Sequence, residues 1–144
     1  MLIRKMTQED VQQVAAIEKA CFSRPWSEKG FYDSLALGYT FFFVAEEDGR
    51  ILGYIGMYLS IEEGEITNVA VHPAARGKGI GTALVRKMID AAKMADAERI
   101  VLEVRKSNAS AIYVYEQSGF ENVGIRKGFY DLPKEDAVIM ICTL

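Results

Sequence analysis

The chain has few of the residues that build metal centres or disulfides. It contains one histidine, His72, and only two cysteines, Cys21 and Cys142. A single histidine and two distant cysteines fit no zinc-ligand spacing, so we expect no metal site. Both cysteines lie among apolar neighbours, so we predict small buried apolar residues rather than a disulfide or a reactive thiol.

Signals for membrane insertion or export are also lacking. No apolar run is long enough for a transmembrane helix, and the first residues lack the apolar stretch and cleavage site of a signal peptide. The 17 basic and 20 acidic residues are interspersed and give a net charge of −3, which argues against a nucleic-acid-binding protein. We therefore expect a cytoplasmic protein with no direct contact to membranes or nucleic acid.

The composition predicts one folded domain. Hydrophobic residues make up 50% of the 144 residues and charged residues 26%, which is typical of a globular protein rather than a disordered one. No internal repeat, low-complexity tract or linker rich in proline and serine occurs. We expect residues 1–144 to form a single domain.

The first part of the chain predicts a short strand and two helices. The strand covers residues 2–5. A helix start signal at residues 7–10 precedes apolar residues spaced three and four apart, which predicts a helix that Pro25 interrupts. Ser27 can cap a second helix. The apolar residues expected on its inward face are Phe31, Leu35 and Leu37.

The periodicity then changes to that of strands. The predicted strands cover residues 40–47, 50–60 and 65–71. Asp48 and Gly49 favour a hairpin turn between the first two, and residues 62–64 predict a turn before the third. Pro73 ends that strand because proline cannot donate a ladder hydrogen bond. The expected arrangement is an antiparallel meander.

The remaining chain alternates helix and strand. Apolar residues at a helical spacing predict a helix after residue 79, and they are Ile80, Leu84, Met88 and Ala92. The further predicted elements are a strand at 99–104, a helix at 108–117, and strands at 120–125 and 136–143. The strands at 65–71 and 99–104 flank a helix, so we expect them to be parallel, with a right-handed crossover.

The element order is therefore β-α-α-β-β-β-α-β-α-β-β. It predicts an α/β (α+β) fold in which a mixed central sheet of about seven strands is flanked by about four helices.

A cationic, glycine-rich segment lies between a predicted strand and a predicted helix. It reads Arg76-Gly77-Lys78-Gly79-Ile80-Gly81-Thr82. The glycines allow a sharp turn, and the helix start offers unpaired N–H groups, so we predict a phosphate site rather than a merely flexible loop. The segment is not a P-loop, and Thr82 stands where a dinucleotide fingerprint requires glycine.

The same segment resembles the pyrophosphate signature of the GNAT family of acetyl-CoA-dependent N-acetyltransferases. That signature is Gln or Arg, two residues, Gly, one residue, then Gly or Ala, and residues 76–81 match it in full. Residues 69–73 resemble the preceding strand of the family, and the likeness covers the whole chain. The resemblance implies acetyl-CoA as co-substrate, and a strand that splays from its parallel neighbour so that the backbone of Val71 can hold an oxyanion. The residues implied to contact acetyl-CoA are Val69, Ala70, Val71, Arg76, Gly77, Lys78, Gly79, Ile80, Gly81, Thr82 and Asn108.

Four stretches carry a narrower resemblance, to the RimI branch of this family, which acetylates the N-terminal alanine of a small-subunit ribosomal protein. They are Pro25-Trp26-Ser27, Leu102-Glu103-Val104-Arg105, residues 107–116 and residues 130–137. The last stretch departs from the usual pattern, because Phe129-Tyr130 stands where paired tyrosines are common. The resemblance implies acetylation of a protein N-terminus, and we expect a monomer.

Glu103 and Tyr115 are the candidate catalytic residues. Strand alternation places Glu103 on the face of the strand opposite to that of Leu102, and the pattern alone favours a solvated glutamate. Helix spacing puts Tyr115 on a face with Ala111, and the pattern alone favours a core tyrosine. The resemblance implies instead that Glu103 removes the amine proton through water, and that Tyr115 protonates the departing thiolate. The amine then attacks the thioester directly, with no acyl-enzyme.

Other readings remain open from the sequence. Trp26 and Tyr130 are candidate linings of the acceptor cleft, or structural aromatics, and we assign no role to His72. The acceptor could be a lysine, a polyamine or another small amine. A non-catalytic acyl-CoA-binding regulatory module, a nucleotide-binding module and a covalent cysteine mechanism are the alternatives of other classes.

Overall fold

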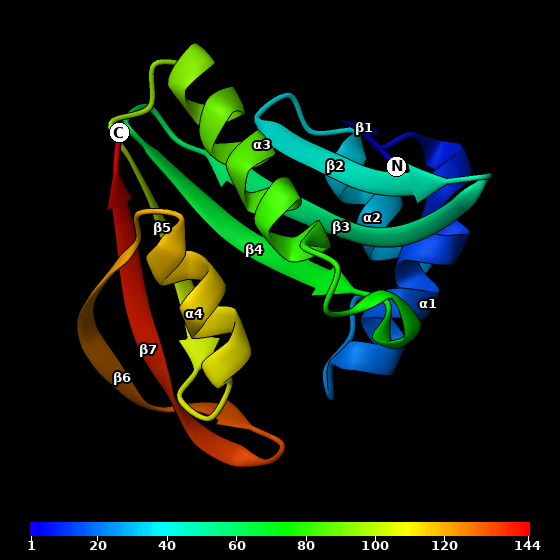
Figure 1. Ribbon diagram of the computed structural model, residues 1–144. Coiled ribbons are helices and arrows are strands. Elements are labelled where there is room, and N and C mark those ends of the chain that lie inside the picture. The colour runs from blue at the N-terminus through cyan, green and yellow to red at the C-terminus, as the bar shows by residue number, and fades with distance from the viewer.

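One mixed β-sheet of seven strands runs through the computed structural model, which describes residues 1–144 (Figure 1). The strands are β1 (Leu2–Lys5), β2 (Thr40–Glu47), β3 (Arg50–Leu59), β4 (Glu63–Val71), β5 (Arg99–Arg105), β6 (Glu121–Asp131) and β7 (Lys134–Thr143). Their spatial order is β1-β2-β3-β4-β5-β7-β6. The helices are α1 (Val11–Cys21), α2 (Glu28–Leu35), α3 (Ile80–Met94) and α4 (Ala109–Gln117), with 3-10 turns at Gln8–Asp10 and Pro73–Ala75. The predicted α/β fold and its element order are confirmed.

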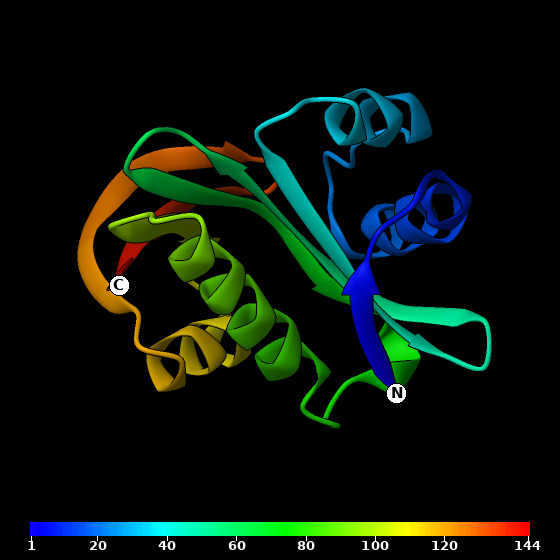
Figure 2. The ribbon, with the colours of Figure 1, turned by 90° about the horizontal axis from the view of Figure 1, so that it is seen from above.

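Helices cover both faces of the sheet. Figure 2 shows α1 and α2 on one face and α3 and α4 on the other. A cluster of 21 buried residues lies under α3 and α4, and a second cluster of 9 lies under α1 and α2. The stripe predicted for α3 is buried, whereas Leu37 lies beyond the end of α2 and is 37% exposed, so its predicted inward position is wrong. No helix is long and apolar enough to cross a bilayer.

Side-chain caps begin three of the helical segments where the sequence predicts them. Asp10 reaches back to accept a hydrogen bond from the Thr7 N–H at 2.8 Å. Ser27 Oγ accepts from the Gly30 N–H at 3.1 Å, and Asn108 Oδ1 accepts from the Ala111 N–H at 3.2 Å. Each cap satisfies an N–H that has no partner within the helix.

The two turns of the meander differ in how well the sequence predicts them. Asp48 and Gly49 have φ angles of 49° and 79°, as a tight hairpin turn requires. The second turn was predicted at residues 62–64, but β4 already begins at Glu63. Gly64 lies inside the strand, where a Cβ would come within 2.5 Å of Met57 Sδ. This glycine allows close packing and does not mark a turn.

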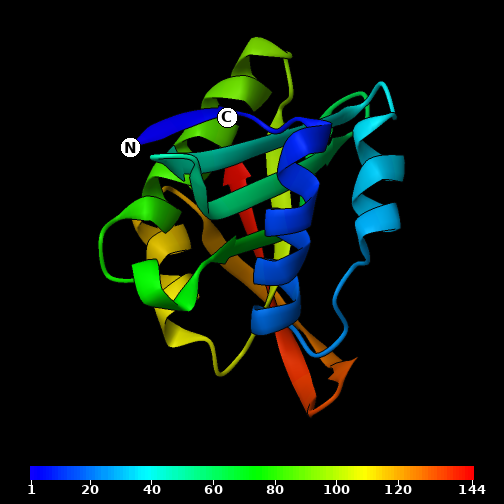
Figure 3. The ribbon, with the colours of Figure 1, turned by 90° about the vertical axis from the view of Figure 1, so that its right-hand side faces the viewer.

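The last hairpin is longer than predicted. The strands expected at 120–125 and 136–143 extend to Asp131 and back from Lys134, with the turn at Leu132 and Pro133. The extension contains charged residues and Gly128, whose φ is 62°, and these do not form a strand pattern that the sequence could predict. The hairpin projects beyond the sheet and lies beside the loop that follows α1 (Figure 3).

Strands β4 and β5 pair in parallel, as predicted, but only over a short length. Their three paired positions end at Glu65 and Val101, after which the strands diverge in a V (Figure 1). A bulge accompanies the divergence, because Gly56 pairs with Asn68 and the next residue, Met57, pairs with Ile66. The predicted splay between these strands is therefore present.

Candidate active site

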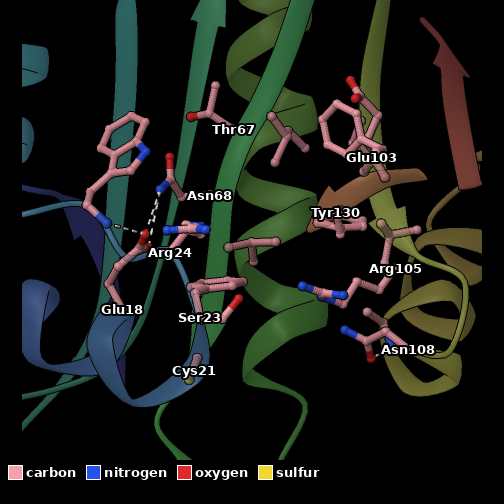
Figure 4. Close-up of a pocket in the computed structure, with 18 of the residues that line it drawn as sticks. Glu18, Cys21, Ser23, Arg24, Thr67, Asn68, Glu103, Arg105, Asn108 and Tyr130 are labelled. Atoms are coloured by element: carbon pink, nitrogen blue, oxygen red, sulfur yellow. Dashed lines mark hydrogen bonds between the residues drawn. The ribbon is translucent and has the colours of Figure 1, made fainter. Parts of the chain in front are cut away.

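Two adjoining cavities lie at the gap between β4 and β5. The first has a volume of about 720 Å³ and is bordered by the loop after α1, the end of β5 and the β6–β7 hairpin (Figure 4). The second, of about 470 Å³, is bordered by the glycine-rich loop and the start of α3. The residues that line both cavities are Cys21, Phe22, Val69, Asn108, Ala111 and Tyr115. A ligand in one cavity can therefore meet a ligand in the other.

The second cavity contains the predicted phosphate loop. Gly77 and Gly79 have φ angles of 81° and 79°, in the left-handed region that favours glycine. A Cβ at either position would meet nothing within 4 Å, so the backbone conformation, rather than space, requires these glycines. The loop leads directly into α3 at Ile80, whose first N–H groups lack helical partners. This open turn at a helix start suits the diphosphate of a coenzyme A ester.

All but one of the residues predicted to contact acetyl-CoA line the second cavity. The exception is Lys78, whose side chain is exposed outside its lining. Arg76 lines it, but its guanidinium folds back onto the chain. Its Nε donates to Val71 O at 3.2 Å, and Nη2 lies 3.2 Å from Cys21 Sγ.

The edge of β4 presents backbone groups of Val69 and Val71 to the gap, of which Val71 O already accepts the hydrogen bond from Arg76 Nε. The His72 N–H donates to Leu52 O at 2.7 Å, so residue 72 bonds toward β3. Alternation along an antiparallel ladder then directs the N–H and C=O groups of Val71 and Val69 away from β3. Beyond Glu65, β5 has diverged and does not pair with them. The groups of Val69 and the Val71 N–H can pair with an extended ligand as a further strand would.

Glu103 extends from β5 into the first cavity. Its neighbours Leu102 and Val104 are buried in the core on the opposite face, which confirms the predicted alternation. The Glu103 side chain is 17% exposed, so it is not the solvated glutamate that the pattern alone favours. Arg126 Nη1 lies 3.3 Å from Oε2.

Tyr115 lines both cavities from α4. Its ring is buried against Phe120, with centroids 5.7 Å apart, while Tyr113 on the same helix is 63% exposed. The Tyr115 hydroxyl has no hydrogen-bond partner within the protein and is not among the buried unpaired groups, so it faces the cavities. Burial, and to a smaller extent nearby Tyr130, raises the pKa of Tyr115, so the phenol keeps its proton.

A buried polar network, which was not predicted from the sequence, holds the loop after α1. The Glu18 carboxylate accepts hydrogen bonds from Asn68 Nδ2 at 3.2 Å (Figure 4), from the Trp26 N–H at 2.9 Å and from the Tyr54 hydroxyl. Burial raises the pKa of Tyr54, and the Glu18 charge raises it further. The sequence signal that could have indicated this network is Glu18 itself, a charged residue next to Ile17 on the apolar stripe of α1. Trp26, whose backbone N–H is bonded to Glu18, lines the first cavity and also packs against Phe31 with ring centroids 5.2 Å apart, so the structure is compatible with both roles left open for it.

An ion pair joins the two walls of the first cavity. Arg24, in the loop after α1, contacts Asp131 of the hairpin through Nε at 3.2 Å and Nη2 at 2.8 Å. Both residues line the cavity, as does Tyr130. The two residues are 107 positions apart, so no local sequence pattern predicts this pair.

The single histidine makes a structural hydrogen bond, and the two cysteines are not joined in a disulfide. His72 Nδ1 accepts a hydrogen bond from the Ala74 N–H at 3.0 Å and caps the turn that follows β4. Cys142 is buried as predicted, whereas Cys21 is only partly buried, at the junction of the cavities, and both are free thiols. No group of three or more histidine, cysteine, aspartate or glutamate side chains could hold a metal ion.

Comparisons with known proteins agree with this geometry. The model of the Acetyltransferase (GNAT) family matches residues 11–120. A Bacillus subtilis (strain 168) protein, provisionally named ribosomal protein bS18-alanine N-acetyltransferase, is 38% identical over 143 residues, which cover 99% of this chain and 95% of the relative. The ribosomal protein bS18-alanine N-acetyltransferase of Escherichia coli (strain K12) is 32% identical over 140 residues, covering 96% of this chain and 94% of that enzyme.

Solved structures show the same fold. The crystal structure of the ribosomal-protein-S18-alanine N-acetyltransferase from Escherichia coli has a TM-score of 0.90 and 30% identity, covering 99% of this chain and 92% of that one. A GNAT family acetyltransferase from Elizabethkingia anophelis, solved with acetyl-CoA bound, has a TM-score of 0.79 and 21% identity, covering 99% of this chain and 97% of that one. The chain therefore belongs to the GNAT family of acetyltransferases.

Proposed function

We propose that the protein transfers an acetyl group from acetyl-CoA to the α-amine of a protein N-terminus, with the N-terminal alanine of ribosomal protein bS18 as its acceptor. The observation that carries this proposal is the meeting of the two cavities at Tyr115. One cavity has the turn and helix start that suit a diphosphate, and the other is wide enough for the first residues of a peptide. Relatives whose names state this activity align over nearly the whole chain.

In this proposal acetyl-CoA lies along the free edge of β4. Its diphosphate accepts hydrogen bonds at the 76–82 turn and the start of α3, and Asn108 borders its pantetheine arm. The arm pairs with the backbone of Val69 and Val71, which places the thioester near Tyr115. The Val71 N–H is the donor for the oxyanion, a contribution of about 2.7–4 kcal/mol in other acyl transfers.

The acceptor amine must lose a proton before or during attack. An N-terminal α-amine has a pKa of about 7.7–8.0, so removing its proton at neutral pH costs little. Glu103 lies in the cavity through which the acceptor enters, and its carboxylate can take the proton through a water molecule. The neutral nitrogen then attacks the thioester carbonyl and forms a tetrahedral intermediate.

The leaving thiolate takes a proton from Tyr115 as the intermediate collapses. The phenol is neutral, has no competing hydrogen bond and lines both cavities. The acetyl carbon forms its bond to nitrogen and breaks its bond to sulfur, and CoA leaves as a thiol. These steps use neither thiol, and acetylation by a Cys21→Ala, Cys142→Ala double variant would exclude the covalent cysteine route.

The experiment is acetyl transfer by the purified protein to short peptides with different N-terminal residues, with the acetylated atom located by mass spectrometry. We expect acetylation of the α-amine, fastest with N-terminal alanine, and loss of about two orders of magnitude in kcat for Glu103→Gln. The matched control is Glu98→Gln, in the loop before β5 and outside both cavities.

Two outcomes would contradict the proposal. Acetylation of lysine side chains or polyamines only would keep the reaction but change the acceptor. Binding of acetyl-CoA without transfer to any amine would indicate a regulatory module instead.

A further inference from the structure

The tip of the β6–β7 hairpin lies beyond the strand that carries Glu103. The ladder between β5 and β7 ends at Arg105, which lies opposite Ala137, and one further backbone bond runs from the Lys106 N–H to Asp136 O at 3.1 Å. The pairing of β6 with β7 is also irregular, with a register break between Arg126 and Tyr130. The backbone ladder alone therefore does not set the position of this wall of the acceptor cavity relative to Glu103.

One guanidinium joins β5 to the hairpin tip. Arg105 Nη1 donates to Pro133 O at 2.9 Å, and Nη2 donates to Leu132 O at 3.1 Å. Nη1 also lies 3.2 Å from Glu135 Oε1. The plane of the group covers Tyr130, with Cζ 4.2 Å from the ring centroid, and Figure 4 shows both side chains in the cavity. The Arg105 side chain is 24% exposed.

The Ser107 N–H also donates to Glu135 Oε2 of β7, at 2.7 Å, and the Arg24–Asp131 link across the cavity is weaker. The Arg24–Asp131 pair has both side chains about two-thirds exposed, at 69% and 67%. Exposed pairs contribute little because water and salt screen them. The contacts of Arg105 are charge-assisted and more buried than the Arg24–Asp131 pair, so they hold the hairpin more firmly than that pair does.

We propose that Arg105 is a positioning residue for the acceptor. It fixes the turn at Leu132–Pro133 and the ring of Tyr130 as the wall along which the first residues of the acceptor lie. The inference rests on the proposed function, because it assumes that the acceptor occupies the first cavity. Arg105 lines that cavity and is absent from the acetyl-CoA cavity, so its effect is confined to the acceptor.

The chemistry of the contacts requires arginine. Lysine keeps the charge but has neither a planar face for Tyr130 nor a fork that reaches two carbonyl groups. In Arg105→Lys we expect the KM for an N-terminal peptide to rise about tenfold or more, with the KM for acetyl-CoA unchanged. The matched control is Arg99→Lys, at the other end of β5, where the guanidinium contacts Glu62 and Glu63 outside this wall.

Two further measurements separate positioning from loss of fold. In Arg105→Ala, added methylguanidinium should lower the acceptor KM, and methylammonium of the same charge should not. In the free protein, Arg105→Lys should speed amide hydrogen exchange at residues 129–135 and leave exchange in α3 unchanged.

The inference is overturned by an unchanged acceptor KM, by an equal rise in both KM values, or by equal rescue with methylammonium. If the wild-type protein acetylates no N-terminal peptide, the proposed function fails. The exchange experiment still decides the role of Arg105 in that case, since unchanged exchange at 129–135 shows that Arg105 does not fix the hairpin.

Discussion

Glu103 and Tyr115 line the same cavity from different elements, Glu103 from β5 and Tyr115 from α4. Only Tyr115 also lines the second cavity, beside the glycine-rich turn. In the proposed mechanism, Tyr115 gives a proton to the leaving thiolate and Glu103 takes one from the entering amine, and both steps depend on this placement.

Replacing Tyr115 by phenylalanine tests the proposed acid. The hydroxyl has no partner in the protein, so Tyr115→Phe should fold normally and bind acetyl-CoA as before. We expect kcat to fall about 100-fold, because the thiolate would leave unprotonated. Steady-state kinetics measures this, and Tyr113→Phe on the same helix should match the wild type. An undiminished kcat for Tyr115→Phe would exclude the phenol from the chemistry.

Gly79→Ala tests the diphosphate turn. Alanine at a φ of 79° costs about 1–2 kcal/mol of backbone strain and shifts the N–H groups of the turn. We expect weaker CoA binding by calorimetry and a higher KM for acetyl-CoA, with the acceptor KM unchanged. Gly49 has the same φ of 79° in the β2–β3 hairpin, so Gly49→Ala is the control for backbone strain alone. Equal effects of the two variants on CoA binding would contradict this assignment.

The pH dependence of kcat/KM follows from two groups. The acceptor amine has a pKa of about 7.7–8.0, so the rate should rise with pH up to about 8.5. Burial raises the pKa of Tyr115 above its ordinary value, so the acid form persists to higher pH. We therefore expect a plateau, with no decline through about pH 10. A decline that begins below about pH 9, present in the wild type and lost in Tyr115→Phe, would mean that the phenol ionises early.

Acid should weaken the protein through Asp10. Burial alone would raise the pKa of Asp10, but hydrogen bonds from Arg4 and the Thr7 N–H outweigh it and lower that pKa. A lowered native pKa means that the unfolded state binds the proton more readily. The stabilisation is therefore complete above about pH 4, and it is lost as the pH falls through the native pKa.

The variant Asp10→Asn should cost about 1–3 kcal/mol of unfolding free energy at pH 7, and less as the pH falls below about 4. Urea unfolding at several pH values measures this. Asp48→Asn, in the exposed hairpin turn, should leave the unfolding free energy unchanged both at pH 7 and below about pH 4. A loss for Asp10→Asn that is the same at pH 7 and in acid would show that the charge of Asp10 is not involved.

Local patterns in the sequence predicted most of the elements and the glycine-rich turn. The α3 stripe, the Asn108 cap and the alternation around Glu103 depend on neighbours within a few residues, and each is present. Gly64 misled the prediction, because a glycine that allows close packing resembles one that makes a turn.

Contacts between distant segments could not be predicted in this way. The Glu18–Asn68 hydrogen bond, the Arg24–Asp131 pair and the contact of Arg105 with Pro133 join segments that only the fold brings together. Resemblance to known acetyltransferases supplied the proposed roles of Glu103 and Tyr115, which their patterns alone did not favour.

A bisubstrate analogue tests the central claim most directly. In such a compound the sulfur of CoA is joined through an acetyl bridge to the α-amine of an alanine-initiated peptide, and Trp26, the single tryptophan, reports binding from the first cavity. If the two cavities meet at Tyr115, the analogue should bind at least 100-fold more tightly than CoA or the peptide alone, because the two halves bind together. An analogue that binds no more tightly than CoA would contradict a shared site for the two substrates.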